Sequence, residues 1–308
     1  MSLPIWIALA IAIVLAAAPI TGGHRTKINE KELAKLPAKY GLPLPPPLRE
    51  RVLSRVNPRE RTALLWGLGG IVAGALAGLL VRFATASQDS TTGVLVLFGG
   101  AVGMSLGSYR GVVRTQLPMS PDAPRVARST ETSLADYVTP AERWAVRLVP
   151  GAMVLAIATV WLVWAQVPVR PPGGLLAPLL ATAIAAMILA VWALLAHART
   201  RLVDRPQQAH DDLELAWDDA LRGAAIRDLQ DTAISLGLLG TFGLLVLAGS
   251  WVIPPEVRAN AEQLTLNLGL TALVVGAVCW IALLTPWGIG RSRRNPSRAL
   301  WPDTFRTA

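Results

Sequence analysis

The sequence contains almost no cysteine and very little histidine. Its single cysteine, Cys279, lies inside an apolar run, and its three histidines are far apart, at positions 24, 197 and 210. A lone cysteine forms no internal disulfide bond, and neither residue type recurs at the spacing of metal ligands. The sequence therefore excludes a disulfide-stabilised scaffold, and we expect no metal centre and no cofactor.

Charged residues are also scarce, at 16% of the 308 residues against about 25% in an average soluble domain. Hydrophobic residues make up 53%, and the mean hydropathy is +0.45. These values exclude an intrinsically disordered chain and an ordinary cytosolic enzyme. A net charge of +9 would suggest a nucleic-acid partner for a soluble chain. Here long apolar runs separate the basic residues, so we expect a membrane protein without a nucleic-acid partner.

Seven apolar runs are long enough, or nearly so, to cross a hydrocarbon layer of about 30 Å as helices. They cover residues 3–20, 64–83, 93–108, 148–166, 174–196, 233–253 and 264–286, the third being the shortest. We predict an all-α, polytopic integral membrane protein with about seven transmembrane helices. Its parts are an N-terminal anchor (1–20), a basic cytoplasmic loop (21–63) and three helix hairpins (64–308), with cytoplasmic loops 109–147 and 197–232 and a basic tail 287–308.

The basic residues fall almost entirely on one side of these runs. The loops, the tail and the segment 21–63 hold 26 of the 29 Lys and Arg residues, and the other side holds only Arg82, Arg170 and Arg258. The positive-inside rule then places the N-terminus outside and the C-terminus in the cytoplasm. We expect the protein to lie in the cell membrane. Positive charge follows the first run, which favours an uncleaved anchor. Cleavage after residues 16–18 stays an alternative.

Glycines recur at four-residue spacing in the second and third runs. They are Gly70, Gly74 and Gly78 in the second and Gly99, Gly103 and Gly107 in the third. Small residues at this spacing let two helix backbones approach closely. We predict that these two spans pack tightly by their glycine faces, or against a copy in another chain.

Two helix hairpins begin with nearly the same phrase. Asn57-Pro58 with Glu60, and Thr139-Pro140 with Glu142, each give a capping residue, a proline at the first helical position and an acidic side chain at the third. Such a repeat also occurs in transporters built from pseudosymmetric halves, but any helix that begins at a basic interface uses the same capping. We therefore expect helix starts at Asn57 and Thr139.

The segment before the second run divides into three predicted parts. Residues 27–39 predict a short basic helix, and the proline-rich residues 42–48 predict extended chain near polyproline II. Residues 48–56 place apolar side chains on one helical face, which predicts an interfacial helix on anionic lipid headgroups.

The third loop carries the one acidic cluster, in which Asp211, Glu214 and Asp218 share a helical face. Paired carboxylates could bind Mg²⁺ in an enzyme that acts on a lipid-linked substrate, but the interleaved apolar residues favour an ordinary amphipathic helix. A further interpretation is that this helix docks on the basic first loop. No phosphate-binding loop, nucleophile elbow or HExxH motif occurs, and the apolar runs lack a central charge, which argues against proton-coupled transport.

The phrase Arg205-Pro206-Gln207-Gln208-Ala209, with Asp212 and the run from Asp218 to Arg222, resembles a group of multi-pass membrane proteins of actinobacteria. This resemblance implies a bacterial inner-membrane setting and adds no catalytic residues. We expect a non-enzymatic accessory or scaffold subunit of a membrane complex, working with a membrane-protein partner or by self-association. The alternative is the membrane-spanning subunit of a transporter energised by another chain.

Overall fold

The computed structural model describes residues 34–85, 91–116, 132–167, 174–207, 209, 211–252 and 300–301. Within these residues 89% of the chain is helical and none forms a strand, so the all-helical prediction is confirmed for them. The helices are α3 (Leu36–Tyr40), α4 (Pro46–Thr85), α5 (Thr91–Gln116), α6 (Leu134–Tyr137), α7 (Pro140–Gln166), α8 (Leu176–Asp204) and α9 (Asp212–Val252). The predicted spans 3–20 and 264–286 lie outside the described residues.

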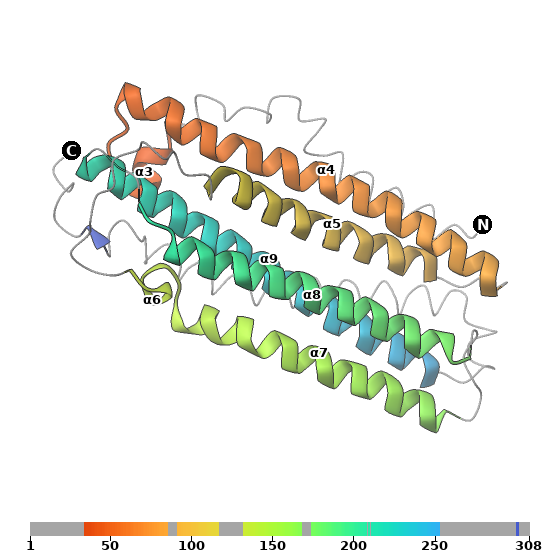
Figure 1. Ribbon diagram of the computed structural model, residues 1–308. Coiled ribbons are helices and arrows are strands. Elements are labelled where there is room, and N and C mark those ends of the chain that lie inside the picture. The colour runs from red at the N-terminus through yellow and green to blue at the C-terminus, as the bar shows by residue number, and fades with distance from the viewer. Residues whose placement is uncertain are drawn as a thin grey trace.

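The five long helices lie side by side in one bundle (Figure 1). Helices α4, α7 and α9 run in one direction, and α5 and α8 run in the other. Four helices of the described part are long and apolar enough to cross a membrane, which indicates a membrane protein: Thr62–Val81 of α4, α7, α8 and Asp212–Gly249 of α9. The count of seven spans and the placement of the termini stay predictions.

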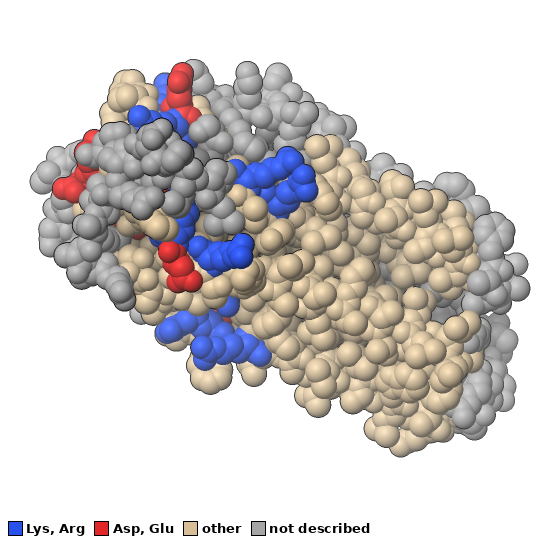
Figure 2. All heavy atoms as spheres, viewed as in Figure 1, with Lys and Arg blue, Asp and Glu red and all other residues tan. Residues whose placement is uncertain are grey.

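Charged and apolar side chains occupy different parts of the surface. On the face shown in Figure 2, the Lys, Arg, Asp and Glu side chains of the described residues lie toward one end of the molecule, and the other described residues form an uncharged body beside them. Large apolar side chains are exposed on that body, and Val72, Leu80 and Leu155, for example, are 59%, 70% and 70% exposed. In water such a surface would be unfavourable, whereas lipid chains would solvate it. We call the opposite, polar part the charged end.

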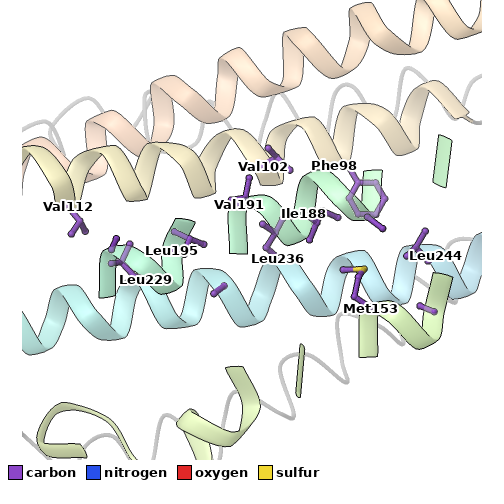
Figure 3. Close-up of a cluster of buried hydrophobic side chains, with 14 of the residues drawn as sticks. Phe98, Val102, Val112, Met153, Ile188, Val191, Leu195, Leu229, Leu236 and Leu244 are labelled. Atoms are coloured by element: carbon purple, nitrogen blue, oxygen red, sulfur yellow. The ribbon is translucent and has the colours of Figure 1, made fainter. Parts of the chain in front are cut away.

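The centre of the bundle is filled by apolar side chains from α5, α7, α8 and α9 (Figure 3). Met153, Ile188 and Leu236 have almost no exposed surface. Gly240 of α9 lies beside Met153 and Ile188, and an added Cβ there would come 2.6 Å from Met153 Cε. The small residue on α9 therefore lets large side chains of α7 and α8 fill the interior.

Helices α4 and α5 contact each other through backbone atoms at their glycines. A Cβ added at Gly103 would lie 3.0 Å from the Cα of Gly70 and would overlap the carbonyl oxygen of Trp66. A Cβ added at Gly99 would lie 3.0 Å from the Cα of Gly74. Backbone atoms inside a helix cannot move aside as a flexible side chain can, so these positions require glycine.

The other two predicted glycines also lie on these two helices. Gly78 of α4 is buried, and a Cβ added at Gly107 of α5 would lie 2.6 Å from the Cα of Ala63. The glycine faces of the two helices thus lie against each other within a single chain.

Helix α4 differs from the sequence-based expectation at its start. The predicted helix start at Asn57 is wrong, because α4 begins at Pro46 and continues through Asn57 and Pro58. The expectation that residues 42–48 are wholly extended is also wrong, because α4 already includes Pro46, Pro47 and Leu48. Prolines fit the first turn of a helix. A proline inside a helix removes one backbone hydrogen bond. The part of α4 that precedes Pro58 packs on α9, and the part that follows Pro58 packs on α5, and these contacts stabilise the helix across the proline.

The second predicted helix start is confirmed. Thr139 is the N-cap of α7, where the amide of Glu142 donates to Thr139 Oγ1 at 3.3 Å and the amide of Thr139 donates to Glu142 Oε2 at 2.7 Å. These two reciprocal bonds satisfy amide groups that a helix start otherwise leaves without a partner.

Replacing Gly103 with leucine should separate α4 from α5, because the new side chain would meet backbone atoms of α4 at Trp66 and Gly70. We expect the free energy of unfolding to fall by about 2–3 kcal/mol, the upper part of the usual range for overpacking. Thermal unfolding of the purified protein in detergent measures this change. The matched control is Gly69→Leu on α4, where an added Cβ has nothing within 4 Å. Equal stability of the two variants would contradict the packing claim.

Candidate functional site

A buried carboxylate lies at the centre of the charged end. Asp219 of α9 has no exposed surface, and in the described part of the chain it accepts hydrogen bonds from three side chains. The donors are Tyr137 Oη at 3.1 Å, Gln207 Nε2 at 2.5 Å and Trp301 Nε1 at 3.0 Å. Burying a carboxylate is unfavourable unless such donors surround it. We call these four residues the Asp219 cluster.

The cluster joins parts of the chain that are far apart in sequence. Tyr137 ends α6, Gln207 lies in the connection from α8 to α9, and Trp301 lies near the C-terminus. Because each donor comes from a different segment, Asp219 holds four segments together at one point.

Local capping holds Tyr137 in position. Its one-turn helix α6 begins after Ser133, whose backbone amide donates to Asp136 Oδ2 at 2.7 Å. After Tyr137 the chain is extended at Val138 and then starts α7 at the Thr139 cap. Two helix caps so close in sequence leave the intervening chain little freedom, so the Tyr137 hydroxyl is held against Asp219.

A second buried pair fastens the end of α8 to α9. Arg222 Nη2 donates to Asp218 Oδ2 at 3.2 Å one turn away on α9, and both side chains are almost fully buried. Arg222 Nη1 also donates to the carbonyl oxygens of Arg205 at 2.9 Å and Val203 at 3.4 Å. These carbonyl groups belong to the end of α8, where helical partners are missing. The Arg222 guanidinium therefore caps α8 from the neighbouring helix.

Burial and charge change the acidity of Tyr137. Loss of solvent around the hydroxyl, together with the negative charge of Asp219, raises the pKa of Tyr137 to about 12. The neutral phenol is the form that donates to the carboxylate, so the hydrogen bond to Asp219 is kept across the physiological pH range.

The segment before α4 packs on another face of α9. Trp217 Nε1 donates to the carbonyl oxygen of Pro43 at 2.9 Å, and the Tyr40 ring lies edge-on to the indole at a centroid distance of 5.6 Å. Leu48 and Val52 of α4 are buried in the same group, which we call the Trp217 cluster. We predicted that residues 48–56 lie on lipid headgroups. In the structure, Leu48 and Val52 are instead buried against α9.

The three acidic residues singled out from the sequence have three different surroundings. Glu214 forms an ion pair with Arg51 of α4. Asp211 is exposed, and its Oδ1 accepts from the amide of Glu214 at 2.6 Å, which caps the start of α9. Asp218 faces Arg222 in the interior. Among the described residues, no group of three His, Cys, Asp or Glu side chains is placed to hold a metal ion.

Sequence reasoning did not single out Tyr137, Trp217 or Trp301, because each lies far in sequence from residues that it contacts. One signal was present in the chain. The phrase that carries the actinobacterial resemblance contains five residues that contribute to the two buried polar groups, namely Arg205, Gln207, Asp218, Asp219 and Arg222. The residues of this phrase thus form buried hydrogen bonds that hold the charged end together.

The buried polar groups of the charged end hold segments of the chain together. The carboxylates of Asp218 and Asp219 both accept hydrogen bonds from protein donors. A pocket beside the cluster, lined by Asp136, Tyr137 and Arg227 among others, has room for about one water molecule. No family model, curated protein or solved structure matches the chain.

Replacing Asp219 with asparagine should destabilise the charged end. An amide can accept at only one of its two atoms, so at least one of the three donors loses its acceptor, at about 1–3 kcal/mol. We expect a lower free energy of unfolding than for Asp204→Asn, which removes an exposed carboxylate at the end of α8. Thermal unfolding followed by tryptophan fluorescence measures both variants, and an equally small effect at the two sites would contradict the role of Asp219.

The raised pKa of Tyr137 predicts a dependence of stability on alkaline pH. In the unfolded chain tyrosine ionises near its ordinary pKa of about 10, whereas in the folded protein it keeps its proton until about pH 12. The contribution of this shift to stability is complete below about pH 10 and is lost as the pH rises through about 12. Between about pH 10 and 12 the free energy of unfolding should therefore fall more steeply for the wild type than for Tyr137→Phe. Parallel curves for the two proteins would refute the shift.

Proposed function

We propose that this protein is a non-enzymatic scaffold, an accessory subunit of a complex in a bacterial cell membrane. The observation that carries the proposal is the Asp219 cluster, which fixes four segments into one rigid body outside the apolar part of the bundle. In the orientation expected from the basic residues, this body lies on the cytoplasmic side. A rigid, charged surface of this kind suits the binding of a partner protein.

The interior of the bundle also supports a scaffold over a transporter subunit. The described parts of α5, α7, α8 and α9 enclose apolar side chains, including Phe98, Met153 and Leu244 (Figure 3). A transport path would need polar groups or space between helices that move relative to one another. Close packing around Gly240 opposes such movement.

The apolar surface leaves room for contacts inside the membrane as well. Val72, Leu76 and Leu80 of α4 are exposed, while its glycine face is already used by α5. Lipid or a helix of a partner protein can cover these side chains.

Reversal of charge at the charged end tests the proposal. Glu50 and Asp212 are exposed near the starts of α4 and α9, so Glu50→Lys with Asp212→Lys should weaken a partner contact without disturbing the interior. Native electrophoresis of tagged protein, extracted from its own membrane in mild detergent, compares the mass of the complex with that of the 32.8 kDa chain. We expect the wild type in a larger complex and the double variant mostly outside it.

Gln166→Lys supplies the matched control, because Gln166 is exposed at the opposite end of α7 and its replacement also adds positive charge. This variant should stay in the complex. A wild-type protein that migrates as a single chain in detergent would overturn the scaffold proposal.

A further inference from the structure

Two arginines lie where the charged end meets the apolar body. Arg147 belongs to the first part of α7, and its guanidinium carbon lies 5.7 Å from the centre of the Trp144 ring. Arg199 belongs to the last part of α8, and its Nη1 donates to Gln230 Oε1 of α9 at 3.3 Å. Burial of the Arg199 guanidinium, and then the like charge of Arg147, disfavour the positive charge of Arg199. Helices α7, α8 and α9 thus each supply one polar group to the same region.

Neither arginine has an acidic partner in the part of the chain that the structure describes. The interaction of Arg147 is with the Trp144 ring, and that of Arg199 is with the neutral amide of Gln230. Two like charges held near each other, one of them half-buried, repel and lose hydration. An anion between them would remove both penalties.

Unused hydrogen-bond donors occur at the same place. Gln230 is 2% exposed, and its Nε2 has no hydrogen-bond partner among the described residues, although its other amide atom contacts Arg199. The Nε of Arg199 is likewise enclosed without a partner there. Buried donors are satisfied in nearly all proteins, so these two call for an acceptor that the described chain does not supply. Donors alone, with two positive charges, match an anion with several oxygen atoms, and guanidinium groups bind phosphate well.

The position along the helices decides where such a phosphate comes from. Arg147 directly precedes the apolar run 148–166, and Arg199 follows the run 174–196 by less than one turn. Trp144, 62% exposed beside Arg147, has the amphipathic ring that is enriched at the level of lipid headgroups. In a membrane, the phosphates nearest to both arginines belong to phospholipids.

We propose that Arg147, Arg199 and Gln230 form a binding site for the phosphate of an anionic phospholipid, in the leaflet at the charged end. The guanidinium groups bind the charge, and the Gln230 amide donates to a phosphate oxygen. The proposal needs only the membrane location of the helices and does not depend on the scaffold function.

Titration with lipids tests the site. The full chain in detergent is mixed with phosphatidylglycerol or with phosphatidylcholine of the same acyl chains, and bound lipid is counted by native mass spectrometry. We expect the wild type to prefer phosphatidylglycerol. Arg147→Gln with Arg199→Gln should weaken that binding about tenfold or more, as the loss of two charge-assisted contacts implies. Arg114→Gln with Arg201→Gln removes the same charge at exposed positions of α5 and α8 and should have a much smaller effect.

Gln230→Glu is a variant that keeps the fold and fills the site from within. Its carboxylate would lie against Arg199 in place of the lipid phosphate. This variant should unfold at a higher temperature than the wild type without lipid, and phosphatidylglycerol should no longer raise its unfolding temperature. The result separates loss of the site from loss of the fold.

Three outcomes would overturn the proposal. Equal loss of lipid binding in the two double variants would show attraction to general surface charge. Equal binding of the two lipids by the wild type would show that no anionic headgroup is selected. If inorganic phosphate at millimolar concentration raised the unfolding temperature as much as phosphatidylglycerol did, the site would hold a free anion and not a lipid.

Discussion

The close approach of helix backbones is the constraint on which the bundle depends. Two helices surrounded by lipid gain little from burying apolar side chains, because lipid chains solvate those side chains equally well. Association then depends on van der Waals contact, which is greatest where side chains are absent. The glycines of α4 and α5 provide such contact, and Gly240 of α9 gives Met153 and Ile188 the space to meet at the centre.

Outside the apolar body the structure is held by different forces. There the Trp217 cluster buries aromatic and aliphatic surface between α9 and the segment before α4. The Asp219 cluster and the Arg222 pair add directed hydrogen bonds that only one arrangement of the segments satisfies. Breaking one such bond leaves a buried polar group without a partner, which makes this part of the molecule rigid as well as stable.

Rigidity at one end and an apolar surface along the body are the two features from which the scaffold role is proposed. The buried acidic groups of Asp218 and Asp219 serve packing and are not arranged as a reactive pair. Buried polar atoms without a hydrogen-bond partner among the described residues include Arg199 Nε and Gln230 Nε2, at the border of the charged end. Contact with the surroundings, both protein and lipid, is thus expected at the surface and the border of the bundle rather than in its interior.

Local pattern in the sequence was enough to predict apolar helices in α4, α5, α7, α8 and α9, and the start of α7. Apolar runs of sufficient length indicate helices whatever lies beside them, and the Thr139 cap involves residues only three apart. The four-residue glycine spacing likewise identified faces for close packing, since each face belongs to one helix. The prediction of a helix start at Asn57 was wrong because α4 already begins at Pro46. Packing of Leu48 and Val52 on α9 stabilises the helical turns that precede Pro58.

The sequence by itself determined the helical class of the described chain, the separation of charged from apolar segments, and the glycine faces, because these depend on composition and on short periods. Only the tertiary structure decided which acidic residues are buried and what they contact. Asp219 meets Tyr137 and Trp301, each 82 positions away, and Arg199 of α8 meets Gln230 of α9. Contacts of that kind depend on how helices are placed beside one another, which no local pattern records.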